Sequence, residues 1–253
     1  WMAGGGSGLF SQYLNDDDDK KMPAIIKALL SLENIDRYVN VKHYRKKEII
    51  IKEGEPGNRV YVLMKGVVMT YRTAPTGQQR MLQFFVPIDL YGNITLVEDF
   101  VHTMTAEAVE PCVNLEIDKE FVKRMMHEKP EILWYFYTDL AKKLRITTEI
   151  IEDSYLTAEQ RIYKGLIRLS SQFGYKTERG IELRIHLTQE NLARYTGTTR
   201  VTVAKTIGHL VHCNILRTKP KPWVICRMDE LMHLMYDRQP PDRKNGRFET
   251  GSG

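Results

Sequence analysis

The chain has 253 residues, of which 42% are hydrophobic and 27% charged, and its formal net charge is +5. This composition is ordinary for a globular protein and excludes an intrinsically disordered chain, and the length suffices for two domains. Every apolar run is interrupted by charge well before the roughly 18 residues of a membrane span, so we expect a soluble, cytoplasmic protein.

The two ends of the chain are expected to lie outside the folded domains. Residues 1–21 combine a Gly-Gly-Gly-Ser linker with an Asp-Asp-Asp-Asp-Lys run, a pattern typical of an enteropeptidase site, so we interpret them as an expression tag. Residues 240–253 are rich in Pro, Gly and charge, which predicts a frayed tail.

Three cysteines, Cys112, Cys213 and Cys226, are far apart in sequence, and each lies within an apolar pattern. We therefore expect small core residues. An odd count argues against a disulfide scaffold, and an iron–sulfur site, which needs about four thiolates, is disfavoured because no cysteine cluster exists.

Short apolar runs separated by turn residues indicate a series of strands in the first half of the chain. Glycine and proline gather at the turns, near residues 54–58 and 75–77. Such spacing is typical of a sandwich or barrel. The expected strands are His43–Ile51, Val60–Leu63, Val67–Arg72, Met81–Phe85, Thr103–Ala108 and Cys112–Ile117.

The period then changes to that of a helix beginning near Pro130. Apolar residues recur at heptad spacing, which predicts a seam that packs on a partner helix. Packing on the chain's own domain is the alternative, because two to three heptads are short for a coiled coil. A second amphipathic helix is expected over Ala158–Ser171. The seam consists of Leu133, Tyr137, Leu140, Leu144, Thr147 and Ile151.

A helix-turn-helix is indicated further along the chain. Thr188 can cap the start of one helix, and Gly197 can end it by adopting a positive φ. Thr199 can then cap a second helix that runs to about His212. Because Ala193 is small, the two helices can cross closely.

The second helix has one apolar face and one open face. Arg200 lies in its first turn, where a guanidinium can bond guanine in the major groove, and Val201 can contact a thymine methyl. Lys205, one turn on, can reach a base edge or a phosphate. The expected core residues are Val203, Ile207 and Leu210, and the open residues are Arg200, Val201, Ala204 and Lys205.

Two short strands, Asn214–Arg217 and Trp223–Cys226, are expected to form a wing after these helices. Lys219 and Lys221 in the connecting loop suit phosphate contacts, although they can equally serve only to solubilise a hairpin. Residues 155–239 hold 14 Lys or Arg against 7 Asp or Glu. This excess favours a polyanion partner over the alternative, a merely solvated face.

The order of these elements resembles the CRP/FNR superfamily of bacterial transcription regulators across residues 24–237. Gly54-Glu55 followed by residues 60–66 resembles its β-roll hairpin, and residues 199–205 resemble its recognition helix. The resemblance implies an α+β fold, a homodimer that binds an inverted-repeat operator in double-stranded DNA, and RNA polymerase as a partner. The implied domains are an N-terminal cyclic-nucleotide-binding-type β-roll effector domain (22–128), a dimerisation helix (129–153) and a C-terminal winged helix-turn-helix DNA-binding domain (154–239).

The residues expected to contact DNA combine the two helix starts, the recognition helix and the wing. They are Thr188, Gln189, Thr199, Arg200, Val201, Thr202, Lys205, Lys219 and Lys221.

The branch of the family decides the expected effector. Cyclic-AMP receptors carry a Gly-Glu-Leu turn and an Arg-Ser/Thr step, where this chain has Gly92-Asn93-Ile94 and His102-Thr103. Without that carboxylate and guanidinium, a cyclic nucleotide loses its charge-assisted bonds. An oxygen-sensing regulator of the iron–sulfur type is disfavoured by the missing cysteine cluster and by Val201 and Ala204 in the recognition helix.

The chain is most similar to the CprK-like, halorespiration branch, whose members bind chlorinated phenols. The shared features are the triplet at residues 201–203 and the run at residues 213–216. The resemblance implies a small aromatic effector, including halogenated phenols, bound as an anion by a lysine of the long helix. The match is incomplete, because a tyrosine and a second lysine of that site fall on Asp139 and Asn93. The effector residues expected are Tyr71, Gly92, Asn93, Asp139 and Lys142.

Three alternatives stay open at this point: a cyclic-nucleotide-dependent regulator of the same fold, a haem-dependent regulator of the same fold, and an interaction module that does not bind DNA. A haem sensor could use His43, His102 or His127, although no cofactor or metal site is indicated. A cyclic-nucleotide-controlled interaction module would keep the β-roll without binding DNA. An enzyme is not expected, because the sequence lacks the HExxH, GxSxG, P-loop and dinucleotide-binding motifs.

Overall fold

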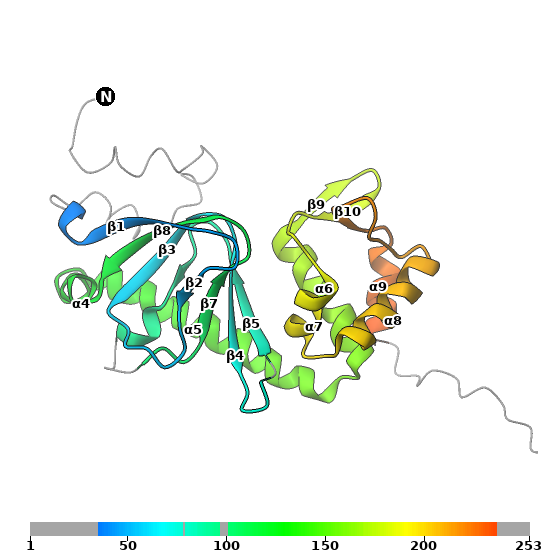
Figure 1. Ribbon diagram of the computed structural model, residues 1–253, viewed down its shortest axis with the longest axis horizontal. Coiled ribbons are helices and arrows are strands. Elements are labelled where there is room, and N and C mark those ends of the chain that lie inside the picture. Colours follow the sequence, from blue (N-terminus) through cyan, green and yellow to red (C-terminus); the bar gives the residue numbers. More distant parts are fainter. Residues whose placement is uncertain (1–34, 78, 97–100, 237–253) are drawn as a thin grey trace, which may run out of the picture.

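The computed structural model describes residues 35–77, 79–96 and 101–236. A β-roll and a helical second part lie side by side, and one long helix, α5 (Pro130–Glu152), runs behind the β-roll and joins the two (Figure 1). The expected tag over 1–21 and tail over 240–253 lie outside the described residues. No helix in the described ranges combines the length and apolarity needed to cross a bilayer.

The β-roll consists of two four-stranded antiparallel sheets, with orders β1-β8-β3-β6 and β2-β7-β4-β5. Strand β3 is buried on both faces, because Val62 packs towards the helices while Leu63 packs between the sheets. The strands are β1 (Val39–Tyr44), β2 (Ile49–Ile51), β3 (Arg59–Lys65), β4 (Val68–Thr73), β5 (Gln79–Phe85), β6 (Leu90–Tyr91), β7 (Thr105–Ala108) and β8 (Cys112–Asp118).

Short helical segments complete the β-roll. Helix α4 (Lys119–Glu128) begins at Asp118, whose carboxylate accepts the Phe121 backbone N–H, and it packs on α5. The 3-10 turns η1 (Ile35–Arg37) and η2 (Asn93–Leu96) lie on β1 and β3, and η3 (Asp153–Tyr155) follows α5.

One expected strand, His43–Ile51, is divided in two. The charged run at residues 45–48 forms a turn in which Glu48 accepts the Arg45 backbone N–H and Lys47 takes a positive φ of 70°. Chain reversal at this turn places β1 and β2 in different sheets. The sequence pattern missed the turn because hydrophobicity resumes directly after it.

The second part is a winged helix-turn-helix. Its four-stranded sheet has the order β11-β12-β10-β9, so the expected wing is extended by a hairpin that the sequence did not reveal. The elements are α6 (Ala158–Phe173), β9 (Gly174–Thr177), β10 (Gly180–Leu183), α7 (Gln189–Thr196), α8 (Arg200–His212), β11 (Leu216–Arg217), β12 (Trp223–Ile225) and α9 (Met228–Tyr236).

The expected burial of the three cysteines holds only in part. Cys112 is buried between the β-roll sheets, and Cys213 is half-buried at the end of α8. Cys226 is exposed, which corrects the expectation of a core residue: strand β12 ends at Ile225, so the pattern of burial ends with it.

The β-roll and the second part share one hydrophobic core. The Phe84 ring on β5 lies 5.6 Å from that of Phe173 and 5.5 Å from that of Tyr195, measured between centroids. Gln172 donates a side-chain hydrogen bond to the Phe84 carbonyl at 3.3 Å. The winged helix-turn-helix therefore packs on β5 of its own chain.

A buried carboxylate connects α5 to α6. Asp153, directly after α5, forms an ion pair at 2.6 Å with Lys164 and another with Arg168, both on α6. Arg168 also reaches Glu149 on the last turns of α5 at 3.4 Å. A buried charge is tolerated only with such partners, so this cluster fixes the two helices against each other.

Candidate effector cavity and nucleic-acid interface

The two helices of the helix-turn-helix begin and end at the expected residues. Thr188 Oγ1 accepts the Asn191 N–H at 3.0 Å, and Gly197 ends α7 in the left-handed conformation (φ 60°, ψ 43°). Thr199 Oγ1 accepts the Thr202 N–H at 3.1 Å and caps α8. The predicted caps are confirmed.

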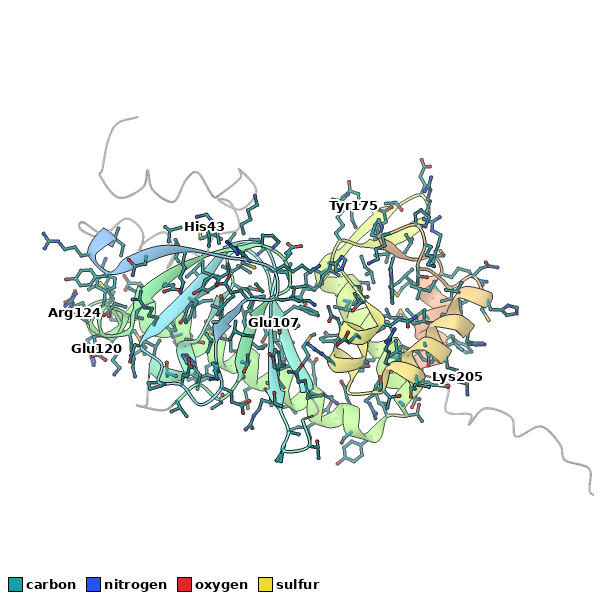
Figure 2. All side chains as sticks on the ribbon, viewed as in Figure 1. His43, Glu107, Glu120, Arg124, Tyr175 and Lys205 are labelled. Carbon is teal, nitrogen blue, oxygen red and sulfur yellow. The ribbon has the colours of Figure 1, made fainter. Side chains whose placement is uncertain are left out.

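Helix α8 leaves one face uncovered by the rest of the chain. Val201 is 79% exposed, and Arg200 and Lys205 are exposed beside it. Two cationic side chains and one apolar side chain are therefore open to solvent in the first half of this helix. Figure 2 shows Lys205 on the side of α8 that faces away from the β-roll. The opposite face is buried through Val203, Ile207 and Leu210.

The other residues expected to contact DNA lie on α8, at the start of α7 and in the loop between β11 and β12. Thr202 is half-buried on α8, and Lys219 and Lys221 are exposed in the loop between β11 and β12. Thr188 lines a polar groove of about 570 Å³ between the β-roll and α7, and Gln189 next to it is half-buried. The start of α7 thus lies beside the β-roll.

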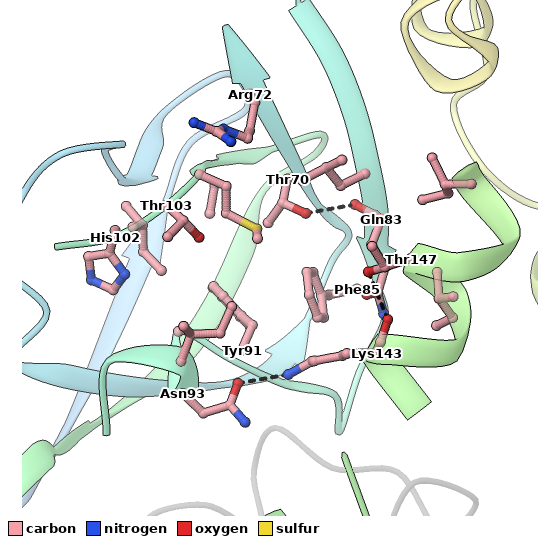
Figure 3. Close-up of a pocket in the computed structure, with 18 of the residues that line it drawn as sticks. Thr70, Arg72, Gln83, Phe85, Tyr91, Asn93, His102, Thr103, Lys143 and Thr147 are labelled. Carbon is pink, nitrogen blue, oxygen red and sulfur yellow. Dashed lines mark hydrogen bonds between the residues drawn. The ribbon is translucent and has the colours of Figure 1, made fainter. Parts of the chain in front are cut away.

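A cavity of about 390 Å³ lies between the β-roll and α5 (Figure 3). Its walls are formed by β4, β5, η2, the segment before β7 and the second half of α5. Most of its lining is apolar, which is typical of a small-molecule site. The apolar lining residues are Ile51, Leu82, Phe85, Ile94, Met104, Ala106, Ile146, Ile150 and Ile151.

The charged group nearest the cavity floor is the ammonium of Lys143. It donates to Asp139 at 2.6 Å, to Asn93 Oδ1 at 2.7 Å and to the Leu90 carbonyl at 3.3 Å. Asn93 Nδ2 in turn donates to Asp139 at 2.9 Å. Burial lowers the pKa of Lys143, while the Asp139 carboxylate acts in the opposite direction. This closed triad connects α5 to η2.

Two of the five expected effector residues, Gly92 and Asn93, line the cavity, and Asp139 contacts it through Asn93. Lys142 is exposed and lies outside the lining; Lys143 takes the expected place, because one residue along a helix turns the side chain by about 100°. Tyr71 also lies outside. Neighbours alternate in facing along a strand, so Tyr71 points to the Arg194 guanidinium, 5.9 Å from its ring.

The sequence missed several residues of the cavity because the lining comes from six separate segments of the chain. Gly92 needs its positive φ of 75°, and a Cβ there would meet the Tyr61 ring at 2.7 Å. His102 is buried in the lining, and burial lowers its pKa. The other two candidate haem ligands, His43 on β1 and His127 on α4, are exposed and outside the lining. Within the described ranges, no group of three or more His, Cys, Asp or Glu could hold a metal ion.

Comparisons with known proteins match both parts of the chain. A cyclic nucleotide-binding domain matches residues 41–129, and a Crp-like helix-turn-helix domain matches residues 160–234. A CRP-like cAMP-activated global transcriptional regulator of Mycobacterium tuberculosis is 30% identical over 185 residues, which are 72% of this chain and 82% of the relative.

Solved structures have the same fold. A CooA mutant from Carboxydothermus hydrogenoformans gives a TM-score of 0.70 at 22% identity and covers 83% of this chain and 95% of its own. CprK in complex with OCPA gives a TM-score of 0.61 at 19% identity, with 80% and 94% covered. At these identities the likeness shows the fold, and the branch within the family stays a prediction.

These matches define the class: a transcription regulator in which a domain of the cyclic-nucleotide-binding type is joined to a DNA-binding helix-turn-helix. The chain belongs to the CRP/FNR family of such regulators.

Proposed function

We propose that the protein is a homodimeric, effector-responsive regulator that binds an inverted-repeat operator through α8. The observation that carries this proposal is the uncovered face of α8, where Arg200 and Lys205 flank the 79% exposed Val201. A guanidinium in the first turn of a recognition helix suits bidentate bonding to guanine, and an exposed valine suits a thymine methyl. RNA polymerase is the proposed partner at the promoter.

Helix α5 supports the homodimer. Its seam is exposed along its length, with Tyr137 at 62% and Leu144 at 67%. A stripe of this kind at heptad spacing is stabilised when a second copy covers it. Thr147 and Ile151 belong both to this seam and to the effector cavity. A ligand in the cavity therefore contacts the helix that two copies share.

This overlap gives the regulation a physical route. A ligand that favours one packing of Thr147 and Ile151 favours one arrangement of the α5 pair. Asp153 then carries that arrangement to α6, and so to the two recognition helices. DNA binding requires these helices to match half-sites about one helical turn apart, so the effector acts by shifting the population with that spacing.

For the effector we propose a small aromatic or otherwise apolar molecule, halogenated phenols included. The apolar lining and the aromatic wall at Phe85 support this choice. Cyclic AMP is the second candidate, because the M. tuberculosis relative is cAMP-activated. Against it, this chain has Asn93 and His102 where the receptors of that ligand use a carboxylate and a guanidinium.

Selection from a random pool of duplex DNA tests the proposal. We expect wild type to enrich an inverted repeat, and Arg200→Ala to lose about 1–3 kcal/mol of discrimination at a guanine in each half-site. Arg179→Ala, which removes an exposed arginine from the β9–β10 turn, is the charge-matched control. Unchanged sequence preference in Arg200→Ala would refute the assignment of the reading residue.

A further inference from the structure

We propose that the effector of this regulator is an uncharged, apolar molecule, and that Lys143 closes the cavity instead of binding a ligand. The inference rests on the proposed function and specifies the ligand class for its effector site. Its starting point is the wall of the cavity, which is apolar on the β-roll side through Leu82 and Phe85 and on the α5 side through Ile146. Such a wall favours the burial of apolar ligand surface.

The ammonium of Lys143 is already saturated. Its three hydrogen bonds, to Asp139, Asn93 and Leu90, use all the protons that an ammonium has. The Lys143 and Asp139 side chains are only 18% and 19% exposed, so the ion pair is shielded from water. Figure 3 shows the lysine reaching Asn93 along the floor of the cavity.

An anionic ligand would have to compete with Asp139 for this lysine. Separating the pair leaves a poorly hydrated carboxylate without its counter-charge, which is strongly unfavourable. A phenolate or a cyclic phosphate therefore gains little from Lys143. A neutral ligand leaves the triad intact.

The other basic groups of the lining do not replace Lys143. Arg72 lies at the rim with its side chain 64% exposed, and it pairs with Glu53 at 3.1 Å. His102 is buried, and burial lowers its pKa, which disfavours the charged imidazolium. In the part of the chain that the structure describes, the lining has no other lysine, arginine or histidine.

The remaining polar atoms of the lining are neutral. Thr70 donates weakly to the Gln83 carbonyl at 3.4 Å, which leaves its oxygen able to accept. Thr103 adds a second hydroxyl on the same side (Figure 3). These groups suit one hydroxyl or carbonyl on an otherwise apolar ligand. A phenol would thus bind in its protonated form.

A matched pair of fluorescent probes tests this inference on the full chain. N-phenyl-1-naphthylamine and 1-anilinonaphthalene-8-sulfonate share one aromatic framework, and only the second carries a negative charge. We expect wild type to bind the neutral probe at least tenfold more tightly than the sulfonate, and cyclic AMP not to displace it. Equal or tighter binding of the sulfonate, displacement by cyclic AMP, or no binding of the neutral probe would overturn the proposal.

Asp139→Asn provides the decisive variant. The substitution keeps an oxygen for Lys143 but removes the counter-charge, so we expect the sulfonate to bind at least fivefold more tightly while the neutral probe changes less than twofold. An unchanged ratio of the two affinities would show that the ion pair does not set the preference.

Leu82→Trp locates the probe. An indole ring in place of the leucine side chain at this half-buried lining position should weaken binding of the neutral probe at least tenfold. The affinity of a probe bound on the exposed α5 seam would be unaffected. Met104→Trp repeats the test from the opposite wall if the first variant folds poorly. Selection of duplex DNA by the same protein preparations distinguishes failure of the ligand class from failure of the proposed function. If DNA is enriched but the neutral probe does not bind, only the ligand class is refuted. If no DNA sequence is enriched, the proposed function is refuted.

Discussion

The guanidinium of Arg80 on β5 lies directly against the α-carbon of Gly197, the left-handed residue between α7 and α8. Arg161 on α6 fixes the other side of this turn, because it donates to the carbonyls of Thr196 and Gly197. Burial lowers the pKa of Arg80, and the nearby Arg161 adds to the effect. The turn of the DNA-binding motif is thus held by both parts of the chain.

Gly197→Ala should lower the free energy of unfolding by more than the strain of a positive φ alone. A Cβ at this position overlaps the Arg80 guanidinium, whereas a Cβ on Gly77, with φ +80°, meets open space. We expect both alanine variants to lose about 1 kcal/mol for the left-handed backbone, and Gly197→Ala to lose about 1 kcal/mol more. Urea unfolding measures both.

The additional loss of stability in Gly197→Ala, relative to Gly77→Ala, should vanish when the Arg80 side chain is removed. In the Arg80→Ala background, Gly197→Ala and Gly77→Ala are expected to have equal costs, because the overlap no longer exists. An excess that survives in that background would contradict the role given to Arg80.

A charge in the α5 seam should weaken the proposed dimer. Leu140→Glu and Leu144→Glu place carboxylates where two apolar stripes meet, so we expect at least a tenfold weaker association, or about 1.4 kcal/mol. Lys142→Glu, on another face of the same helix, is the control and should stay dimeric. Sedimentation velocity over a concentration series gives the constants, and a dimer that tolerates both seam variants would refute this interface.

The wing lysines should contribute affinity without sequence preference. Lys219→Ala and Lys221→Ala are each expected to lower the slope of log K against log salt by about 0.9, because one phosphate contact releases about that fraction of a counterion. The selected DNA sequence should stay the same. Lys65→Ala, an exposed lysine at the end of β3, is the control. Anisotropy titrations at several salt concentrations decide, and an unchanged slope would leave the wing without a phosphate contact.

Asp89 should make the protein less stable as the pH rises. Burial raises its pKa from 3.8 to about 6, although the Val86 N–H that it accepts acts the other way. The folded state then holds its proton more tightly than the unfolded state, so the stabilisation is complete below about pH 4 and is lost as the pH rises through about 6.

Asp89→Asn removes this dependence. At pH 8 we expect the variant to exceed wild type by at most about 3 kcal/mol, with the difference shrinking towards pH 5. Urea unfolding at both values of pH measures it, with Asp229→Asn, an exposed aspartate in the first turn of α9, as the control. A constant difference between pH 5 and pH 8 would contradict the raised pKa.

The DNA-binding motif could be predicted from sequence because its signals are local. Thr188 and Thr199 cap helices within three residues of their own position, and Gly197 ends one by its own conformation. The same holds for α5, where heptad spacing and Pro130 are both readable in one stretch. Short-range chemistry of this kind does not depend on the rest of the fold.

The cavity could be predicted only in outline, because its residues are assembled by distant pairing. An error of one position moved the expected lysine from Lys143 to Lys142, and strand alternation turned Tyr71 towards α7. The contact between Arg80 and Gly197 was invisible for the same reason, since 117 positions separate the two residues. The hairpin of β9 and β10 and the helix α9 carry no distinctive pattern in the sequence.

The carboxylate of Asp153 couples any movement of α5 to the DNA-binding helices. Because Lys164 and Arg168 on α6 form ion pairs with Asp153 at the end of α5, the long helix and the helix-turn-helix have little freedom to move relative to each other. A small rotation of the two α5 helices against each other would therefore change the angular position of both recognition helices around the DNA double helix. The residues that line the cavity could then change during evolution to accept new ligands, provided that each ligand still rotated α5 in the same way.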